Sequence, residues 1–258
     1  MEKNREDRVH IRIIYLLLLL LILILNQCST GNQLTAFKKK AITKINLSHR
    51  GLTEIPKEIF EFTELETLIL HHNKISEIPE DISKLTKLKK LVLSRNNIRV
   101  IPNNLFDLNN LEYLSLKANK IDSIPESIGN LTNLETLILS FNNLQFLPDS
   151  ICRLPNIFQM MLGYNNLLSL PNDIGKLTSL KELYINNNDL KELPSSFYEL
   201  SLYVLDLHMY SNENILSEKI CDMRSLENLT IDMANFIYAP ICLTVRANNN
   251  QRFFIIIR

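Results

Sequence analysis

The residues best suited to chemistry are histidines and cysteines, and the histidines come first. His49 and His72 are separated by 23 residues, an interval that recurs throughout the chain, and His71 adjoins the second of them. Imidazoles on neighbouring strands can share a metal ion. No carboxylate or cysteine accompanies them in the pattern, so we interpret them as solvated surface histidines and expect no metal site.

The four cysteines, Cys28, Cys152, Cys221 and Cys242, are too few and too scattered for a disulfide framework or a zinc motif. Cys152 and Cys221 are three 23-residue intervals apart, which on a parallel sheet is roughly 14 Å. A disulfide needs Cα atoms within about 7 Å, so these two are not expected to pair. Cys221 and Cys242 are about one interval apart, and a bond between them is feasible.

Other catalytic motifs are missing from the sequence. It contains no P-loop, no glycine-rich dinucleotide-binding turn and no nucleophile motif. Lysine plus arginine equal aspartate plus glutamate at 28 each, whereas a nucleic-acid-binding protein usually has a basic excess. We therefore predict that the protein is not an enzyme, uses no cofactor and does not bind nucleic acid.

The N-terminus has the features of an export signal. Charged residues 1–12 precede thirteen uninterrupted apolar residues, 13–25, and small residues follow at Ser29, Thr30 and Gly31. A membrane-spanning helix needs about 20 apolar residues, whereas the apolar part of a signal peptide needs about 7–15. We predict a signal peptide over residues 1–30, with an uncleaved signal anchor as the alternative.

Residues 25–28, LNQC, resemble in part the lipid-modification box of bacterial lipoproteins. Leu25 stands three residues before Cys28, as in that box, but Asn26 and Gln27 replace the small residues preferred there. Cys28 is therefore a candidate for lipid attachment.

An internal period of 23 residues dominates the rest of the chain, and such a period indicates a repeat architecture. Three positions show it most clearly: the leucine that opens each unit, an asparagine eight residues later and a proline six residues after that. They are Leu65, Leu88, Leu111, Leu134, Ile157 and Leu180; Asn73, Asn96, Asn119, Asn142, Asn165 and Asn188; and Pro56, Pro79, Pro102, Pro125, Pro148, Pro171 and Pro194. Pro240 lies two periods after Pro194, so we expect the array to run over residues 42–248, in nine units, with an irregular unit near 201–215.

One unit shows what the fixed residues do. In LETLIL, residues 65–70, Leu68 and Leu70 should point into a core while Thr67 and Ile69 point outward, as in a short strand. Asn73 ends the strand, and a column of stacked asparagine side chains can bond the backbone groups of neighbouring turns. Pro79 cannot continue a strand, so the chain returns there through an extended or helical segment.

The pattern L-x-x-L-x-L-x-x-N-x-L-x-x-I-P-x-x-I-x-x-L-x-x resembles the leucine-rich repeat family, most closely its proline-containing 23-residue class, known from bacterial surface proteins and Ras-scaffold proteins. The resemblance implies an α/β solenoid: a right-handed superhelix of about nine repeats with a parallel β-sheet on its concave side. It also implies a protein partner, whose identity the sequence does not reveal, bound by the outward strand positions.

Three outward columns should form that surface. They are Lys44, Thr67, Lys90, Tyr113, Thr136, Gln159 and Glu182; Asn46, Ile69, Val92, Ser115, Ile138, Met161 and Tyr184; and His49, His72, Arg95, Ala118, Phe141, Tyr164 and Asn187. The candidate partner-binding residues are Tyr113, Ile138, Phe141, Met161, Tyr164 and Tyr184, because large apolar side chains dominate binding surfaces. Lys44, Lys90 and Arg95 should steer the partner. The alternative is that these residues simply suit strands.

The domain organisation follows: a signal segment at 1–30, an N-terminal cap at 31–41, the array at 42–248 and a capping strand at 249–258. The sequence RFFIIIR, residues 252–258, begins where a tenth strand would fall. We predict a monomeric, non-catalytic module that is secreted or held on the outer face of a membrane, touching the membrane only through its N-terminal segment. An intracellular signalling scaffold and an adhesin-like spacer are the alternatives.

Overall fold

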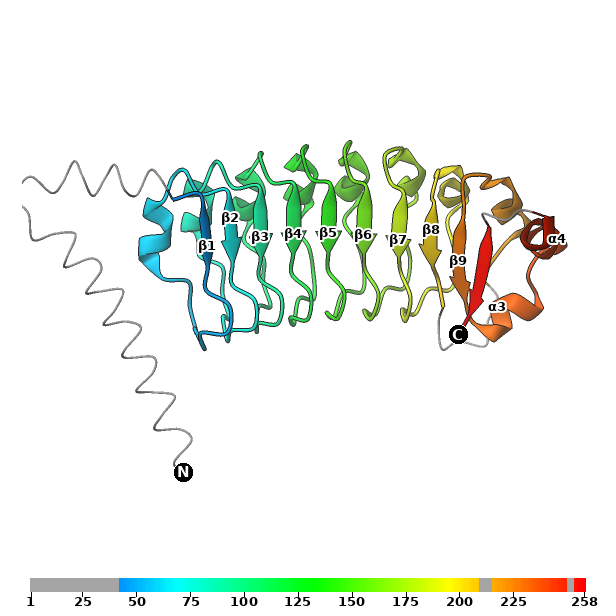
Figure 1. The fold of residues 1–258 in the computed structure, drawn as a ribbon, viewed down its shortest axis with the longest axis horizontal. Coiled ribbons are helices and arrows are strands. Elements are labelled where there is room, and N and C mark those ends of the chain that lie inside the picture. Colours follow the sequence, from blue (N-terminus) through cyan, green and yellow to red (C-terminus); the bar gives the residue numbers. More distant parts are fainter. Residues whose placement is uncertain (1–41, 209–214, 250–252) are drawn as a thin grey trace, which may run out of the picture.

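The structure is a computed structural model that describes residues 42–208, 215–249 and 253–258. The predicted signal segment, N-terminal cap and Cys28 lie outside these residues. Ten strands form one parallel sheet in the order of the sequence, β1 to β10 (Figure 1). They are β1 Lys44–Asn46, β2 Thr67–Ile69, β3 Lys90–Val92, β4 Tyr113–Ser115, β5 Thr136–Ile138, β6 Gln159–Met161, β7 Glu182–Tyr184, β8 Val204–Asp206, β9 Asn228–Ile231 and β10 Phe254–Ile257.

The strand register follows the period of the sequence. From β1 to β7 each residue pairs with the one 23 positions later, for example Thr67 with Lys90. At the irregular unit Glu182 pairs with Val204, 22 residues on, and Val204 then pairs with Asn228, 24 residues on. The early start of this unit is therefore compensated within one repeat, and the later strands return to phase.

Short 3₁₀ helices line the opposite side of the solenoid. They are η1 Lys57–Glu61, η2 Glu80–Lys84, η3 Asn103–Asp107, η4 Glu126–Asn130, η5 Asp149–Arg153, η6 Ile174–Lys176, η7 Ser195–Glu199 and η8 Glu218–Asp222. Six of them follow the repeated proline directly, since η6 follows Asp173 and η8 follows Ser217. Proline is favourable there because its ring holds φ near the helical value and its missing N–H has no partner to lose.

The core is a continuous column between these two layers. Leu68 and Leu70 from the strand and Ile82 and Leu85 from the helical side are all 0% exposed. The inward assignment made from the sequence for these residues is therefore confirmed. Because each unit contributes only a thin slice of apolar side chains, it is buried by its neighbours and not by itself.

The repeated asparagines join consecutive units through their side-chain amides. Asn96 is typical: its Oδ1 accepts a hydrogen bond from the backbone N–H of Ile75 at 3.0 Å. Its Nδ2 donates to the carbonyls of Leu70, at 3.0 Å, and Leu93, at 2.9 Å. Asn73, Asn119, Asn142, Asn165 and Asn188 make the equivalent contacts.

The C-terminal end departs from the repeat. Helices α3 (Met233–Ile237) and α4 (Ile241–Asn249) replace the 3₁₀ segment of the ninth unit. Ala234 lies two 23-residue periods after Asn188, so the sequence predicts it for the asparagine column. Asn235 takes that position instead: its Oδ1 accepts a hydrogen bond from the N–H of Ile215 at 3.0 Å. Asp232 caps α3 and shifts the chain by one residue, accepting from the N–H of Asn235 at 2.9 Å.

Two further features close this end. Cys221 and Cys242 form a disulfide with Cα atoms 5.9 Å apart, so the feasible pair does form and ties α4 to η8. Strand β10 pairs in parallel with β9, and its Ile255 is partly buried against the core. The described helices are all too short or too polar to cross a membrane.

Candidate functional site

The outward side of the sheet is the surface on which large side chains gather. We define the sheet face as four columns of residues. The first two columns lie on the strands, and the third and fourth consist of residues that follow the strands in the sequence. The first column is Lys44, Thr67, Lys90, Tyr113, Thr136, Gln159, Glu182 and Val204, and the second is Asn46, Ile69, Val92, Ser115, Ile138, Met161, Tyr184 and Asp206. The third is Ser48, His71, Ser94, Lys117, Ser140, Gly163, Asn186 and His208, and the fourth is His49, His72, Arg95, Ala118, Phe141, Tyr164 and Asn187.

Every residue of the fourth column has a left-handed backbone conformation. Their φ angles lie between 53° and 61°. Each donates its backbone N–H to the carbonyl of the third-column residue in the next unit, as His72 does to Ser94 at 2.9 Å. This conformation is rare for residues other than glycine and is tolerated best by asparagine and aspartate. Only Asn187 is of these two residue types, so the sequence predicted a turn here but not its left-handed conformation.

Phe141 and Tyr164 form the most prominent aromatic feature of the sheet face. Their rings stack with centroids 4.2 Å apart and an interplanar angle of 8°. Yet Phe141 is 44% exposed and Tyr164 is 41% exposed. The ammonium of Lys117 lies 5.2 Å from the Phe141 ring centroid. Two stacked rings with this much open surface offer an apolar contact that is already ordered.

The other predicted contact residues are less available. Ile138, Met161 and Tyr184 are direct neighbours on β5, β6 and β7. Ile138 is only 9% exposed, so it offers little open surface to a partner. The Tyr184 hydroxyl donates to Glu182 at 3.3 Å. Burial, followed by the nearby Glu182 carboxylate, raises the pKa of Tyr184.

Tyr113 stands apart from that row. It pairs with Thr136 in the first column, and the ammonium of Lys90 lies 4.3 Å from its ring centroid. Burial raises the pKa of Tyr113. The six predicted residues therefore form a stacked pair, a neighbouring row of three and a separate cation-covered tyrosine.

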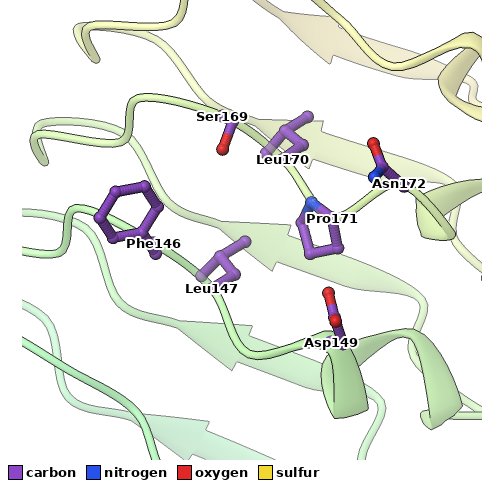
Figure 2. A pocket seen from close by; sticks show the side chains of 7 residues that line it. All are labelled: Phe146, Leu147, Asp149, Ser169, Leu170, Pro171 and Asn172. Carbon is purple, nitrogen blue, oxygen red and sulfur yellow. The ribbon is translucent and has the colours of Figure 1, made fainter.

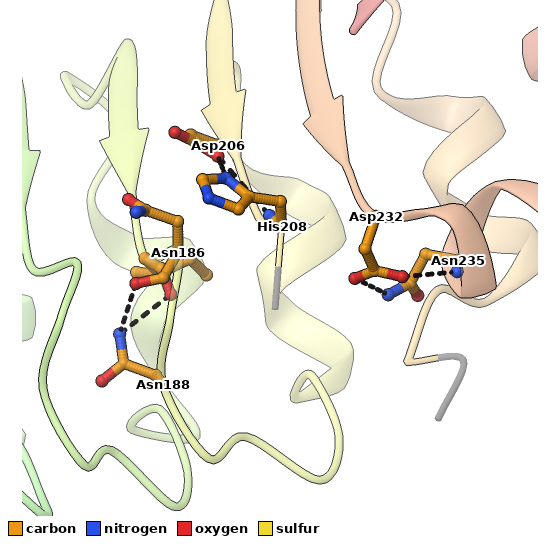
Figure 3. A network of polar contacts seen from close by, with 7 residues as sticks. Asn186, Asn188, Asp206, His208, Asp232 and Asn235 are labelled. Atoms are coloured by element: carbon orange, nitrogen blue, oxygen red, sulfur yellow. Dashed lines mark hydrogen bonds and ion pairs between the residues drawn. The ribbon is translucent and has the colours of Figure 1, made fainter. Parts of the chain in front are cut away.

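A buried polar group occupies the C-terminal part of the face (Figure 3). The Nδ1 atom of His208 lies 2.6 Å from Oδ1 of Asp206, and the two side chains are only 8% and 13% exposed. Asn186 lies beside this pair, and its carbonyl accepts from Asn188 at 3.4 Å. The pair was not predicted from the sequence, although an aspartate and a histidine two residues apart on an extended segment share one face.

The histidines at the other end cluster as expected from their spacing. The rings of His49 and His72 stack 4.5 Å apart, and the His71 ring lies 5.4 Å from His49. Burial, followed by the charge of His49 and Arg95, lowers the pKa of His71. In the described part of the chain, no three side chains of His, Cys, Asp or Glu converge in a metal-binding arrangement.

A hollow of about 240 Å³ lies away from the sheet face (Figure 2). It is lined by Phe146, Leu147, Asp149, Ser169, Leu170, Pro171 and Asn172, from the proline-containing segments of two successive units. Phe146 is 56% exposed at its edge. Asp149 supplies the one carboxylate of the lining, and no histidine, lysine or second carboxylate accompanies it there, so the lining does not form an acid–base pair.

Cys152 is the free cysteine of the described residues, and it is buried. Burial, with smaller contributions from Asp173 and Asp149, raises the pKa of its thiol to about 11. At neutral pH the thiol is therefore protonated, and a protonated buried thiol is a poor nucleophile.

Comparison with known proteins identifies the repeat. Two family models described as leucine rich repeat match residues 40–98 and 179–200. A third, described as leucine-rich repeat region, matches residues 101–185. No curated protein matches the chain.

Solved structures with similar folds include a plant receptor. The plant peptide hormone receptor RGFR1 in complex with RGF2 has a TM-score of 0.69 and 31% identity over 84% of this chain and 36% of the receptor chain. The structure of PEPR1-AtPEP1 has a TM-score of 0.62 and 27% identity over 74% of this chain and 31% of that chain. The chain therefore spans about a third of the length of either. Internalin C2 from Listeria monocytogenes has a TM-score of 0.67 at 20% identity over 76% of this chain and 83% of that one, which shows a shared fold.

Proposed function

Because residues 40–98 and 101–200 of this chain belong to the leucine-rich repeat family, we propose that the protein is a non-catalytic module that binds a protein partner on its sheet face. The observation that carries the proposal is the exposed Phe141–Tyr164 stack at the centre of the sheet. Large aromatic side chains supply most of the binding energy in many protein interfaces. The complexes of RGFR1 with RGF2 and of PEPR1 with AtPEP1 support a peptide or protein as partner.

The remaining details extend this proposal. The protein acts as a monomer and is secreted or held on the outer face of a membrane by residues 1–30 or by a lipid on Cys28. The repeats belong to the proline-containing 23-residue class, which the prolines before six of the 3₁₀ helices support.

The test is a selection of displayed random peptides on the whole protein, followed by hydrogen-exchange mapping of each selected binder. Binding should protect backbone amides of β4 to β7, and the double variant Phe141→Ala, Tyr164→Ala should weaken it by roughly 2 kcal/mol. The matched control is Phe146→Ala, Tyr238→Ala, since both residues are exposed aromatics outside the sheet face. Protection on the 3₁₀ side, with equal binding to both double variants, would contradict the proposal.

A further inference from the structure

Positive charge without a carboxylate partner is concentrated at the N-terminal half of the sheet face. Lys44, Lys90, Arg95 and Lys117 lie in its columns over β1 to β4, and no carboxylate occurs in those columns before Glu182. None of the four cations lies within ion-pair distance of a carboxylate of the described residues. The contacts of Lys90 and Lys117 are with the rings of Tyr113 and Phe141.

Cations elsewhere in these units are arranged differently. Lys87 pairs with Glu64, Lys89 with Glu66 and Arg99 with Asp122, and each pair joins positions 23 residues apart. The repeat thus places opposite charges in register in columns outside the sheet face, where they neutralise each other. Within the sheet face the same register stacks cations beside neutral residues, so their charge remains available to a ligand.

The C-terminal half of the face has the opposite sign. Glu182 accepts hydrogen bonds from Gln159, at 2.5 Å, and from Tyr184, and no cation of the described residues contacts it. Asp206 follows on the next strand and contacts His208. The Phe141–Tyr164 stack lies between the cationic and anionic parts.

The dimensions of the face set the size of its ligand. From β1 to β8 there are seven inter-strand steps of about 4.8 Å, or roughly 34 Å in all. An extended peptide advances about 3.3 Å per residue, so roughly ten residues cross the eight strands. The cationic part of the face, over β1 to β4, is long enough for roughly four residues of such a peptide.

We propose, on the basis of the proposed function, that an extended segment of the partner, about ten residues long, lies across the sheet face. Its charged residues follow a defined order. The segment is acidic where it crosses β1 to β4, aromatic or apolar over β5 and β6, and without carboxylates over β7 and β8. Charge complementarity along the face then determines the direction in which the segment lies.

A polypeptide fits this face better than a uniform polyanion does. A nucleic acid or a sulfated glycan long enough to reach the aromatic stack and beyond would bring its anionic groups against Glu182 and Asp206. Like charges brought together in an interface are unfavourable. A polypeptide can change the sign of its side chains along its length and avoid this repulsion.

The experiment selects phage-displayed random decapeptides on the full-length protein and on two charge-reversed variants. The test variant is Lys90→Glu, Arg95→Glu, Lys117→Glu, and the control is Lys57→Glu, Lys74→Glu, Lys120→Glu. The control changes net charge equally at exposed positions outside the sheet face. Circular dichroism melting checks the fold, and Gln replaces Glu in any variant that fails to fold.

The wild-type pool should be enriched in aspartate and glutamate at one end and in aromatic residues at the centre. The selected peptides should bind the test variant at least about tenfold more weakly and the control within about twofold, with an affinity that falls as salt is raised.

Three results would overturn the inference. In the first, the peptides bind the double variant Phe141→Ala, Tyr164→Ala more weakly but bind the charge-reversed variants as well as the wild type. This result would refute the charge order and leave the proposed function unaffected. Heparin or duplex DNA binding the wild type as tightly as the best peptide would make the ligand a polyanion. An empty pool, or peptides indifferent to every variant, would count against both the inference and the proposed function.

Discussion

Single residues connect the units of this solenoid through the side-chain amide of one asparagine per repeat. The Oδ1 atom of Asn119 accepts from the N–H of Ile98 at 3.0 Å, and its Nδ2 donates to the carbonyls of Leu93 and Leu116 at 3.0 and 2.9 Å. Each asparagine therefore satisfies backbone groups of two successive units. The asparagine amide carries an acceptor oxygen and two N–H donors on separate atoms, which a serine or threonine hydroxyl does not.

Replacement of Asn119 by alanine should lower the free energy of unfolding by about 1–3 kcal/mol, because it leaves backbone groups at the turn unpaired. The measurement is the urea midpoint followed by circular dichroism. Asn97→Ala is the matched control, since Asn97 is exposed and near the same turn. A midpoint that is the same for both variants would show that the column does not stabilise the stack.

The left-handed turn after each strand is a second residue-scale feature. Ala118 has φ 56°, a conformation that costs an L-residue about 1–2 kcal/mol relative to the right-handed one. Glycine has no such cost but loses more conformational entropy on folding. Ala118→Gly should therefore stabilise the protein by up to about 1 kcal/mol, and the thermal midpoint should rise. A marked destabilisation would mean that the Ala118 methyl group contributes packing that outweighs the strain.

The histidine cluster makes stability depend on pH. The pKa of His71 is lowered in the folded protein, mainly by burial and then by His49 and Arg95. The unfolded chain therefore binds a proton more readily than the folded one, and stability decreases as pH falls below about 6.5. His71→Asn should reduce this decrease in urea titrations between about pH 7 and pH 5. An identical pH dependence in both proteins would refute the role of His71.

At the scale of elements, the units of β1 to β8 each combine a three-residue strand with a short 3₁₀ helix, whereas the four-residue strand β9 is followed by α3 and α4. The disulfide from Cys221 to Cys242 spans 21 residues and joins η8 to α4 across this change. A cross-link of that length restricts the unfolded chain and stabilises a fold by about 3 kcal/mol in the loop-entropy model.

Reduction with dithiothreitol should therefore loosen the C-terminal end first. We expect faster hydrogen exchange in α4 and β10 than in β2 to β6, because a repeat array can open locally at a terminus. The variant Cys221→Ser, Cys242→Ser should behave like the reduced protein and should not respond to the reductant. Exchange that accelerates equally in all strands would indicate that the array unfolds as one unit.

The whole molecule is an open array with different chemistry at its two ends. On the sheet face, cations without an ion-pair partner among the described residues lie in the units of β1, β3 and β4. Stacked aromatic rings lie in the middle, and carboxylates lie on β7 and β8. Such an arrangement gives a bound segment one preferred direction. Rim charges mainly affect the association rate and its salt dependence, while buried aromatic contacts mainly determine dissociation.

Export is the whole-molecule prediction that rests on residues 13–25. Expression in the native host, followed by mass spectrometry of the purified protein, should yield an N-terminus near residues 28–31. A mass increase on Cys28 would identify a lipid anchor. Protein that begins at Met1 and is recovered from the cytosol would contradict both forms of the prediction.

The repeating framework was determined by the sequence alone. The positions of Leu68, Leu70 and Pro79, and their recurrence every 23 residues, specify which side chains enter the core and where each strand ends. This works because stacking places equivalent residues in equivalent environments, so a single unit describes its neighbours. Even the shifted unit at Val204 was visible, since Pro240 returns to the phase of the earlier prolines.

Only the tertiary structure decided which outward residues are available and how the array ends. Ile138 and Phe141 are both outward and apolar, yet one is 9% and the other 44% exposed, because exposure depends on side chains from adjacent units. Asn235 replaces Ala234 in the asparagine column because Asp232 caps a helix there. The left-handed turns arise from hydrogen bonds to the next unit. Whether a cation of the sheet face has a carboxylate beside it depends on which columns are adjacent. These properties belong to pairs of units, and a pattern within one unit does not contain them.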